Sequence, residues 1–180
     1  MTISPAPQSI VLAAALAGAA NTSVPADELP TPQHVSICAD SDSAALLLAA
    51  RRYAAFWNTG EARWAQLALS NSFVDRTLPQ GRPQGPSGPL MASQSFRAAV
   101  PDLRAEMADV VIAADRVSVR LHFTGHFTGQ MGTVRGSGQP VDFQAFDLYR
   151  VEAGVIVENW HLEDNLTLQR QLGLIPSSGS

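Results

Sequence analysis

Apolar positions recur at helical spacing in the first half of the chain. The spacing predicts a helix from Ser43, a suitable N-cap, to the stop signal at 58–60. Two shorter helices are predicted over 61–69 and 93–100. The Gly- and Pro-rich stretch 79–89 is predicted to be a loop, neither helix nor interior strand.

The pattern changes to strands after Pro101. Apolar and polar residues alternate strictly over 117–124, which predicts a half-buried strand. Three further strands and a short terminal helix are predicted over 104–114, 141–150, 155–162 and 165–172. Helices followed by strands favour an α+β domain, with an antiparallel sheet and the helices gathered on one face. Such a domain can enclose an apolar pocket between the sheet and the helices.

The first 42 residues are predicted to lie outside this domain as a disordered or signal-like arm. Residues 21–42 are rich in Pro, Ser, Thr and Asp. The apolar run 10–20 is too short to span a bilayer; it resembles a signal peptide, with 17–19 as a cleavage triplet, but no Lys or Arg precedes it. We therefore favour a cytoplasmic protein, with a periplasmic or secreted one as the alternative. The domain is predicted to occupy 43–174, and 175–180 to form a tail.

Composition excludes several classes of protein. All 12 basic residues are Arg, they are scattered, and the net charge is -4, which disfavours a nucleic-acid partner. The single cysteine, Cys38, cannot form an internal disulfide, and no Cys/His spacing resembles a zinc site. We expect no structural metal.

Three stretches resemble one family. They are Phe73-Val74-Asp75, the segment GHFTG from Gly125 with its following Gly-rich loop, and the run FDLYRVEAGVIVENWHLED with Gln171-Leu172-Gly173. From about 43 to 173 the chain resembles the SnoaL-like polyketide cyclases, or ester cyclases, of the nuclear transport factor 2-like superfamily. The resemblance implies a cone-shaped, curved antiparallel sheet packed on three helices, an apolar pocket, and a homodimer or higher oligomer. It also implies ring closure by intramolecular aldol chemistry without cofactor or metal.

In those cyclases an Asp on the last strand acts as general acid/base, near a His on the preceding strand. The matching positions here hold His161 and Asp147, so the two residue types are exchanged. Both lie 7 residues from Gly154, which predicts that they are cross-strand neighbours. We predict that Asp147 orients His161 for proton transfer. The alternative is a half-exposed His161, with Asp147 paired to an Arg.

Asp164 is a further catalytic candidate, although its place before the terminal helix favours an N-cap role. Glu163 is expected to be solvated. His126, in GHFTG, is a candidate for substrate binding, but it is shifted by one residue from the family's His, which would turn it to the other face of a strand. Among the aromatic residues, Trp160 is the first candidate for the pocket, followed by Phe146, Tyr53 and Trp57.

These observations leave three hypotheses. The first is a cofactor-independent acid/base enzyme that acts on a hydrophobic, carbonyl-containing small molecule by cyclisation, isomerisation or lactone chemistry. The second is an epoxide or lactone hydrolase, in which Asp147 and Asp164, with Arg120 or Arg150, activate a water molecule. The third is a non-catalytic carrier that holds a small molecule in the cavity.

Overall fold

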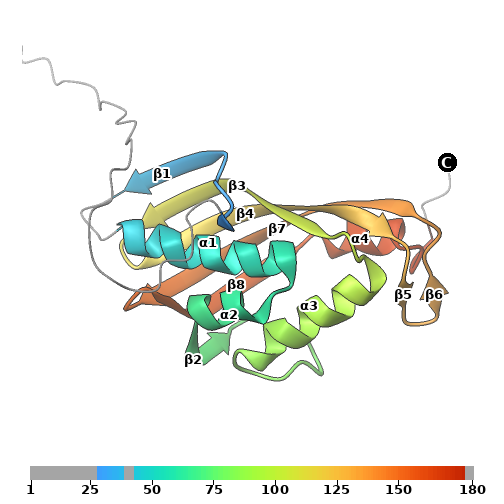
Figure 1. Cartoon of the computed structure of the whole chain (residues 1–180), viewed down its shortest axis with the longest axis horizontal. Coiled ribbons are helices and arrows are strands. Elements are labelled where there is room, and N and C mark those ends of the chain that lie inside the picture. Colours follow the sequence, from blue (N-terminus) through green and yellow to red (C-terminus); the bar gives the residue numbers. More distant parts are fainter. Residues whose placement is uncertain (1–27, 39–42, 177–180) are drawn as a thin grey trace, which may run out of the picture.

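The computed structural model describes residues 28–38 and 43–176. They form an α+β domain, as the sequence predicts (Figure 1). The elements along the chain are β1 (His34–Cys38), α1 (Ser43–Thr59), α2 (Ala62–Ala68), β2 (Leu69–Asp75), α3 (Ser87–Ala99), β3 (Arg104–Ala113), β4 (Arg116–Phe127), β5 (Gln130–Met131), β6 (Val134–Arg135), β7 (Gln139–Glu152), β8 (Val155–Glu163) and α4 (Asn165–Gln171).

The main sheet has six strands in the order β1-β3-β4-β7-β8-β2. Its four central strands pair antiparallel, which confirms the predicted hairpins. The two edge strands pair parallel, β1 with β3 and β2 with β8, and the sequence pattern predicted neither of them. All five residues of β1 are exposed. Val35 and Ile37 alternate with polar neighbours, but a five-residue alternation within a Pro- and Asp-rich stretch is too short to predict a strand. Strands β5 and β6 form a separate hairpin.

Helices α1, α2 and α3 lie against one face of the curved sheet (Figure 1). The inward residues of β7 are buried and alternate with exposed ones, because successive side chains in a strand point to opposite faces. Tyr53 and Phe56 from α1 and Tyr149 from β7 are fully buried between the two layers. The rings of Tyr53 and Tyr149 meet edge to face, with centroids 5.6 Å apart. The core therefore lies between the helices and the concave face.

Helix α3 begins at Ser87, earlier than the sequence predicts. The loop predicted over 79–89 therefore ends at Pro86, and Gly88 and Pro89 belong to the first helical turn. Proline is tolerated there because the first N–H groups of a helix have no partner within the helix. The Pro-rich composition thus hid the start of the helix.

The folded unit also begins earlier than the predicted boundary at residue 43. Leu29 belongs to the buried core, and the Arg51 side chain donates hydrogen bonds to the carbonyls of Leu29 and Pro30, at 2.9 and 2.8 Å. The backbone N–H of Gln33 donates to the Met107 carbonyl, which leads the chain into β1. Residues 28–38 are therefore part of the domain. The signal-like run and its cleavage triplet lie outside the described residues.

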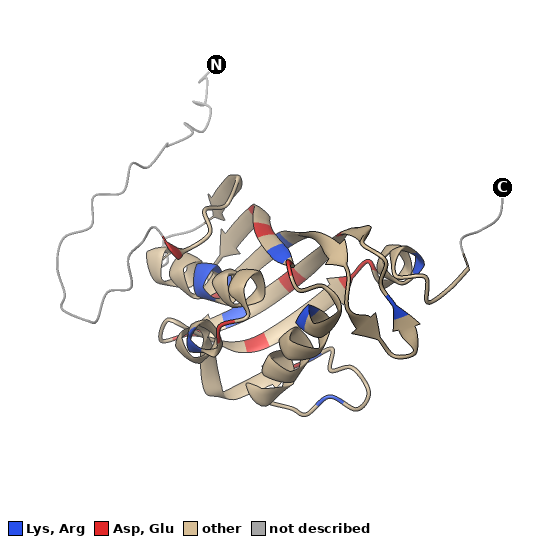
Figure 2. Ribbon diagram, turned by 45° about the vertical axis from the view of Figure 1, so that its right-hand side comes forward, with Lys and Arg blue, Asp and Glu red and all other residues tan. Residues whose placement is uncertain are grey.

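No helix in the described ranges combines the length and the apolarity needed to cross a membrane. Basic and acidic residues are interspersed along the described chain, and neither sign is confined to one part of the ribbon in Figure 2.

Replacing Leu29 with Ala should lower the free energy of unfolding by about 2 kcal/mol, because the side chain is only 8% exposed and its removal leaves a cavity. Urea unfolding followed by circular dichroism measures this. Ile37→Ala is the matched control in the same segment. Ile37 is exposed, so its change should stay within about 0.5 kcal/mol. Equal losses for both variants would contradict the assigned packing of residues 28–38.

Candidate active site

A register shift between β7 and β8 decides which side chains face the interior. The hairpin turn pairs Glu152 with Val155 and Val151 with Ile156, and the pairing then shifts by one residue. Beyond the shift Asp147 pairs with His161. Such a bulge turns all later side chains of its strand to the opposite face. His161 therefore lies on the same concave face as Asp147, and their predicted cross-strand pairing is confirmed.

These inward residues reach a cavity of about 400 Å³ between the sheet and helices α1 and α3. Its size lies in the range of small-molecule sites, which is about 300–1,000 Å³. The wall is mainly aromatic and aliphatic: it includes Tyr53, Trp57, Phe96, Leu121, Phe123 and Phe143. The rings of Phe123 and Phe143 stack with centroids 4.9 Å apart. Aromatic rings arranged in this way offer stacking surfaces to a flat, apolar molecule.

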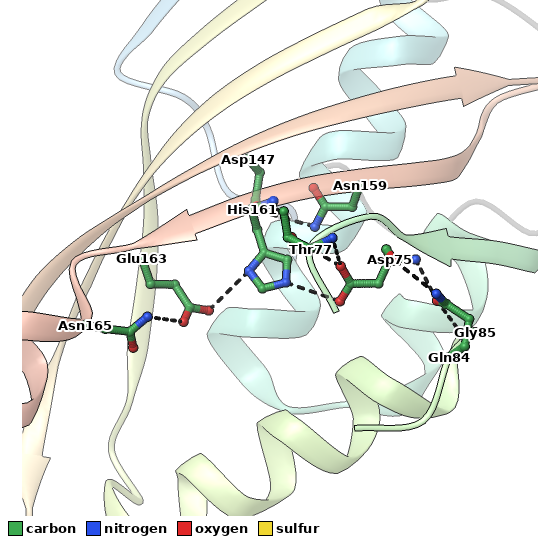
Figure 3. A network of polar contacts seen from close by, with 9 residues as sticks. All are labelled: Asp75, Thr77, Gln84, Gly85, Asp147, Asn159, His161, Glu163 and Asn165. Atoms are coloured by element: carbon green, nitrogen blue, oxygen red, sulfur yellow. Dashed lines mark hydrogen bonds and ion pairs between the residues drawn. The ribbon is translucent and has the colours of Figure 1, made fainter. Parts of the chain in front are cut away.

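His161 forms its closest side-chain contact with Asp75, at the end of β2. The Nε2 atom of His161 lies 3.2 Å from Oδ2 of Asp75, and Nδ1 lies 3.7 Å from Oε1 of Glu163 (Figure 3). Thr77 fixes this arrangement. Its backbone N–H donates to Oδ1 of Asp75, and its hydroxyl oxygen accepts a hydrogen bond from the backbone N–H of His161. When Nε2 donates to the carboxylate, Nδ1 keeps its lone pair and can accept a proton.

Asp147 is buried at the same end of the cavity. Tyr149 donates its hydroxyl to Oδ2 of Asp147 at 2.8 Å, and the Asn159 amide donates to Oδ1 at 3.3 Å. Burial raises the pKa of Asp147 to about 6, although the hydrogen bond from Tyr149 and the charge of His161 act in the opposite direction. This carboxyl group can therefore carry a proton near neutral pH.

Asn159 provides a second partner for that proton. Its Oδ1 atom is buried and has no hydrogen-bond partner among the described residues. Its Nδ2 atom contacts Asp147 at a long distance, 3.3 Å. A half-turn of the amide exchanges the two atoms, and Oδ1 then accepts the proton of a neutral Asp147. The Asn159 side chain can thus satisfy both the charged and the protonated form of Asp147.

The prediction that Asp147 orients His161 needs correction, because Asp75 makes the hydrogen bond to the imidazole. The Asp147 carboxylate is already engaged by Tyr149 and Asn159, and the imidazole turns toward β2 instead. Asp75 and His161 are separated by 86 positions in the sequence. Only Phe73-Val74-Asp75, quoted above for the family resemblance, gave a signal for this residue.

Tyr53 and Trp57 line the cavity, whereas three other candidates do not. Trp160 and Phe146 lie on the outer face of the sheet, since the bulge that turns His161 inward turns its neighbour Trp160 outward. There Trp160 packs against the Arg116 guanidinium, 5.3 Å from the ring centroid. His126 is exposed and bound to Asp102, at 2.7 Å. The expectation that these three residues bind substrate is therefore not supported by their positions.

Asp164 caps helix α4, accepting a hydrogen bond from the Thr167 N–H at 3.0 Å. Hydrogen bonds from the side chain and the backbone of Thr167 lower the pKa of the exposed carboxyl group. The cap role that the sequence favours is confirmed, and Asp164 does not line the cavity. The two arginines considered for a hydrolase are also elsewhere. Arg120 pairs with Asp109, and Arg150 pairs with Glu158.

Glu163, expected to be solvated, lines the cavity beside His161. Its side chain is still one-third exposed, so it lies near the opening rather than in the depth of the cavity. Among the residues that the structure describes, no group of three or more His, Cys, Asp or Glu side chains is arranged to hold a metal ion.

Fold and site together define an α+β domain built around a small-molecule cavity with titratable side chains at one end. Residues 47–172 match the model of the SnoaL-like polyketide cyclases. The chain belongs to this family, as the resemblance in its sequence implies.

Solved structures agree with this assignment. The chain is similar to a candidate polyketide cyclase from Bacillus cereus ATCC 10987, with 39% identity over 83% of this chain and 96% of the other, and a TM-score of 0.74. It is also similar to IdmH, a candidate polyketide cyclase from Streptomyces antibioticus, with 26% identity over 73% and 97% of the chains and a TM-score of 0.62. TsrD from Streptomyces laurentii shares the fold, with 24% identity over 76% and 100% and a TM-score of 0.68. No curated protein matches significantly.

The raised pKa of Asp147 makes stability depend on pH. The folded protein holds this proton to a higher pH than the unfolded chain does, so the contribution of Asp147 to stability is most favourable below pH 3.8 and falls as the pH rises through about 6. The loss amounts to about 3 kcal/mol for this buried group. Asp147→Asn removes the titrating group and with it this pH-dependent loss of stability. The variant should therefore gain stability relative to the wild type between pH 4 and pH 7.

Urea unfolding of both proteins across this pH range measures the difference. Asp142→Asn is the matched control, because Asp142 is an exposed Asp on the same strand. A wild-type-minus-variant difference that stays constant with pH would show that Asp147 is not held with a raised pKa.

Proposed function

We propose that the protein is a cofactor-independent acid/base enzyme of the cyclase type, acting on a hydrophobic, carbonyl-containing small molecule. One observation carries the proposal: an Asp75–His161 hydrogen bond lies in an apolar cavity that also holds the buried carboxyl group of Asp147. Membership of the SnoaL-like polyketide cyclase family supports the same chemistry.

His161 is proposed as the general base. With Nε2 held by Asp75, the Nδ1 atom accepts a proton from the carbon next to a substrate carbonyl. The Asp75 carboxylate then stabilises the imidazolium that forms, much as the carboxylate of a catalytic triad stabilises its His. Asp75 is accordingly a positioning residue for His161.

Asp147 is proposed as the general acid. The enolate carbon attacks a second carbonyl of the same molecule, and the oxygen of that carbonyl takes a proton from neutral Asp147. The His161 imidazolium then passes its proton to the Asp147 carboxylate, and both side chains return to their starting state. One carbon–carbon bond forms, one carbon–oxygen double bond becomes single, and no atom is gained or lost, so the ring closure needs no cofactor.

The hydrolase alternative has less support. In the form that the sequence suggested it used Asp164 with Arg120 or Arg150, and all three of these residues lie outside the cavity. The acid/base pair in the cavity also favours an enzyme over a passive carrier, because a carrier needs no buried titratable group.

His161→Gln should lower kcat by at least about 100-fold, because the general base is lost while the ring is replaced by a side chain of similar reach. Turnover is measured with aromatic substrates carrying 1,3-dicarbonyl side chains, in a screen that uses the wild type as reference. His126→Gln is the matched control, since His126 is an exposed His paired with an Asp outside the cavity. Full activity of His161→Gln, with an unchanged thermal midpoint, would refute the role of His161.

A homodimer is proposed through the outer face of the sheet. Phe146 and Leu162 form a cross-strand pair there and are 55% and 74% exposed, and Leu148 and Val111 extend the apolar surface across β4. An isologous interface needs a self-complementary surface, and this one has both Arg120 and Asp109 at its border. A second copy of the chain, related by a two-fold axis, fits this requirement.

Leu162→Asp should convert the dimer to a monomer, because each interface would then bury two carboxylates in an apolar contact. Sedimentation equilibrium at micromolar concentration measures the mass. Leu67→Asp, an exposed Leu on α2 away from the sheet, should leave the mass unchanged. A monomeric wild type, or a dimeric Leu162→Asp, would contradict the proposal.

A further inference from the structure

Arg82 is the only Arg among the described residues that line the cavity, and the chain contains no Lys. It lies on the segment 76–86, which connects β2 to α3. Apart from Tyr53, the other titratable residues of the lining are Asp75, Asp147, His161 and Glu163. Arg82 therefore provides the one permanent positive charge of the cavity.

The guanidinium of Arg82 is free to bind a ligand. No side-chain hydrogen bond or ion pair joins it to another described residue, whereas the arginines on either side of it in the sequence are engaged. Arg76 binds the Glu158 carboxylate, and Arg97 donates to the carbonyls of Trp57 and Leu103. Five N–H donors of Arg82 thus remain available on the side of the cavity.

The segment that carries Arg82 is fixed to the sheet. The Gln84 side chain accepts from the Asp75 N–H at 2.7 Å and donates to the Asp75 carbonyl at 2.9 Å, as a neighbouring strand would. The Arg82 N–H closes a turn onto the Pro79 carbonyl. The loop therefore holds Arg82 on a defined side of the cavity.

The absence of a side chain at Gly88 lets the loop that carries Arg82 pack against helix α3. A Cβ atom at Gly88 would lie 3.5 Å from Cγ and Cδ of Arg82 and 2.5 Å from the Pro83 carbonyl oxygen. The stem of Arg82 thus packs over the first turn of α3, where any side chain would displace the loop.

The charge of Arg82 acts on the interior of the cavity. Burial raises the pKa of the Tyr53 phenol well above its usual value, the charge of Asp147 adds to the effect, and the charge of Arg82 opposes it.

We propose that Arg82 binds a carboxylate of the substrate, which makes the substrate class an aromatic, carbonyl-containing acid rather than a neutral molecule. A guanidinium binds a carboxylate through two parallel hydrogen bonds, which gives both affinity and orientation. The carboxylates of Asp75 and Glu163 have the same sign of charge as the ligand's carboxylate and repel it, so Arg82 is the charged residue of the lining that binds it. The aromatic body then lies along Phe123 and Phe143. This inference rests on the proposed function only in taking the cavity as the substrate site.

Binding of matched probes tests the proposal without turnover. The probes are 2-naphthoate and anthracene-2-carboxylate, each compared with its methyl ester, by isothermal titration calorimetry at pH 8 and low salt. The wild type should bind at least one acid about tenfold more tightly than its ester, and Arg82→Gln should remove that preference while leaving the affinity for the ester unchanged. Arg82→Lys should keep part of the preference, because the charge remains and the two-point geometry is lost.

Arg104→Gln is the control, since Arg104 is an exposed Arg outside this cavity, and it should leave the preference intact. Gly88→Ala should weaken binding of the acid, since its methyl group displaces the loop that holds Arg82. No acid preference in the wild type, or a preference that survives Arg82→Gln, would overturn the proposal. An Arg82-dependent preference together with full activity of His161→Gln would leave this inference standing while refuting the proposed function.

Discussion

The bulge between β7 and β8 is the constraint on which the site depends. A continuous ladder from the turn at Ala153-Gly154 would place Asp147 opposite Trp160 and turn His161 to the outer face. One extra residue in β8 reverses this, so His161 and Asn159 join Asp147 on the concave face, while Trp160 and Leu162 join the outer one. The lining of the cavity and the apolar outer surface thus arise from the same local irregularity.

The two carboxyl groups at this end of the cavity, those of Asp75 and Asp147, have different surroundings. Asp75 receives hydrogen bonds from the backbone N–H and the hydroxyl of Thr77 and contacts the His161 imidazole. Asp147 has only neutral donors, the Tyr149 hydroxyl and the Asn159 amide, and burial raises its pKa. The surrounding aromatic wall strengthens the hydrogen bonds of both groups, because it keeps the local dielectric low.

By the resemblance, His161 and Asp147 stand where the family carries Asp and His, and in this structure each of the two has partners of its own. The imidazole at the last strand finds its carboxylate on β2 rather than on the neighbouring strand β7. The carboxyl group on β7 is instead embedded in a Tyr–Asn environment. The parallel pairing of β2 with β8 brings Asp75 to this place, and it is the one feature of the site that comes from an edge strand.

The sequence by itself determined the fold class, the antiparallel hairpins, the family and the cap at Asp164, because these depend on local periodicity, turn residues and short spacings. Equal spacings from Gly154 predicted the Asp147–His161 pairing, but it is the bulge in β8 that brings these two residues opposite each other. Only the tertiary structure decided that Asp75 is the partner of His161, since contacts between strands far apart in sequence leave no local pattern. It also decided that Trp160, Phe146 and His126 lie outside the cavity and that Arg82 lies along it. A bulge shifts the side chains of a strand to the other face without a distinct mark in the sequence, and a Pro-rich loop shows no periodicity that could place its charges.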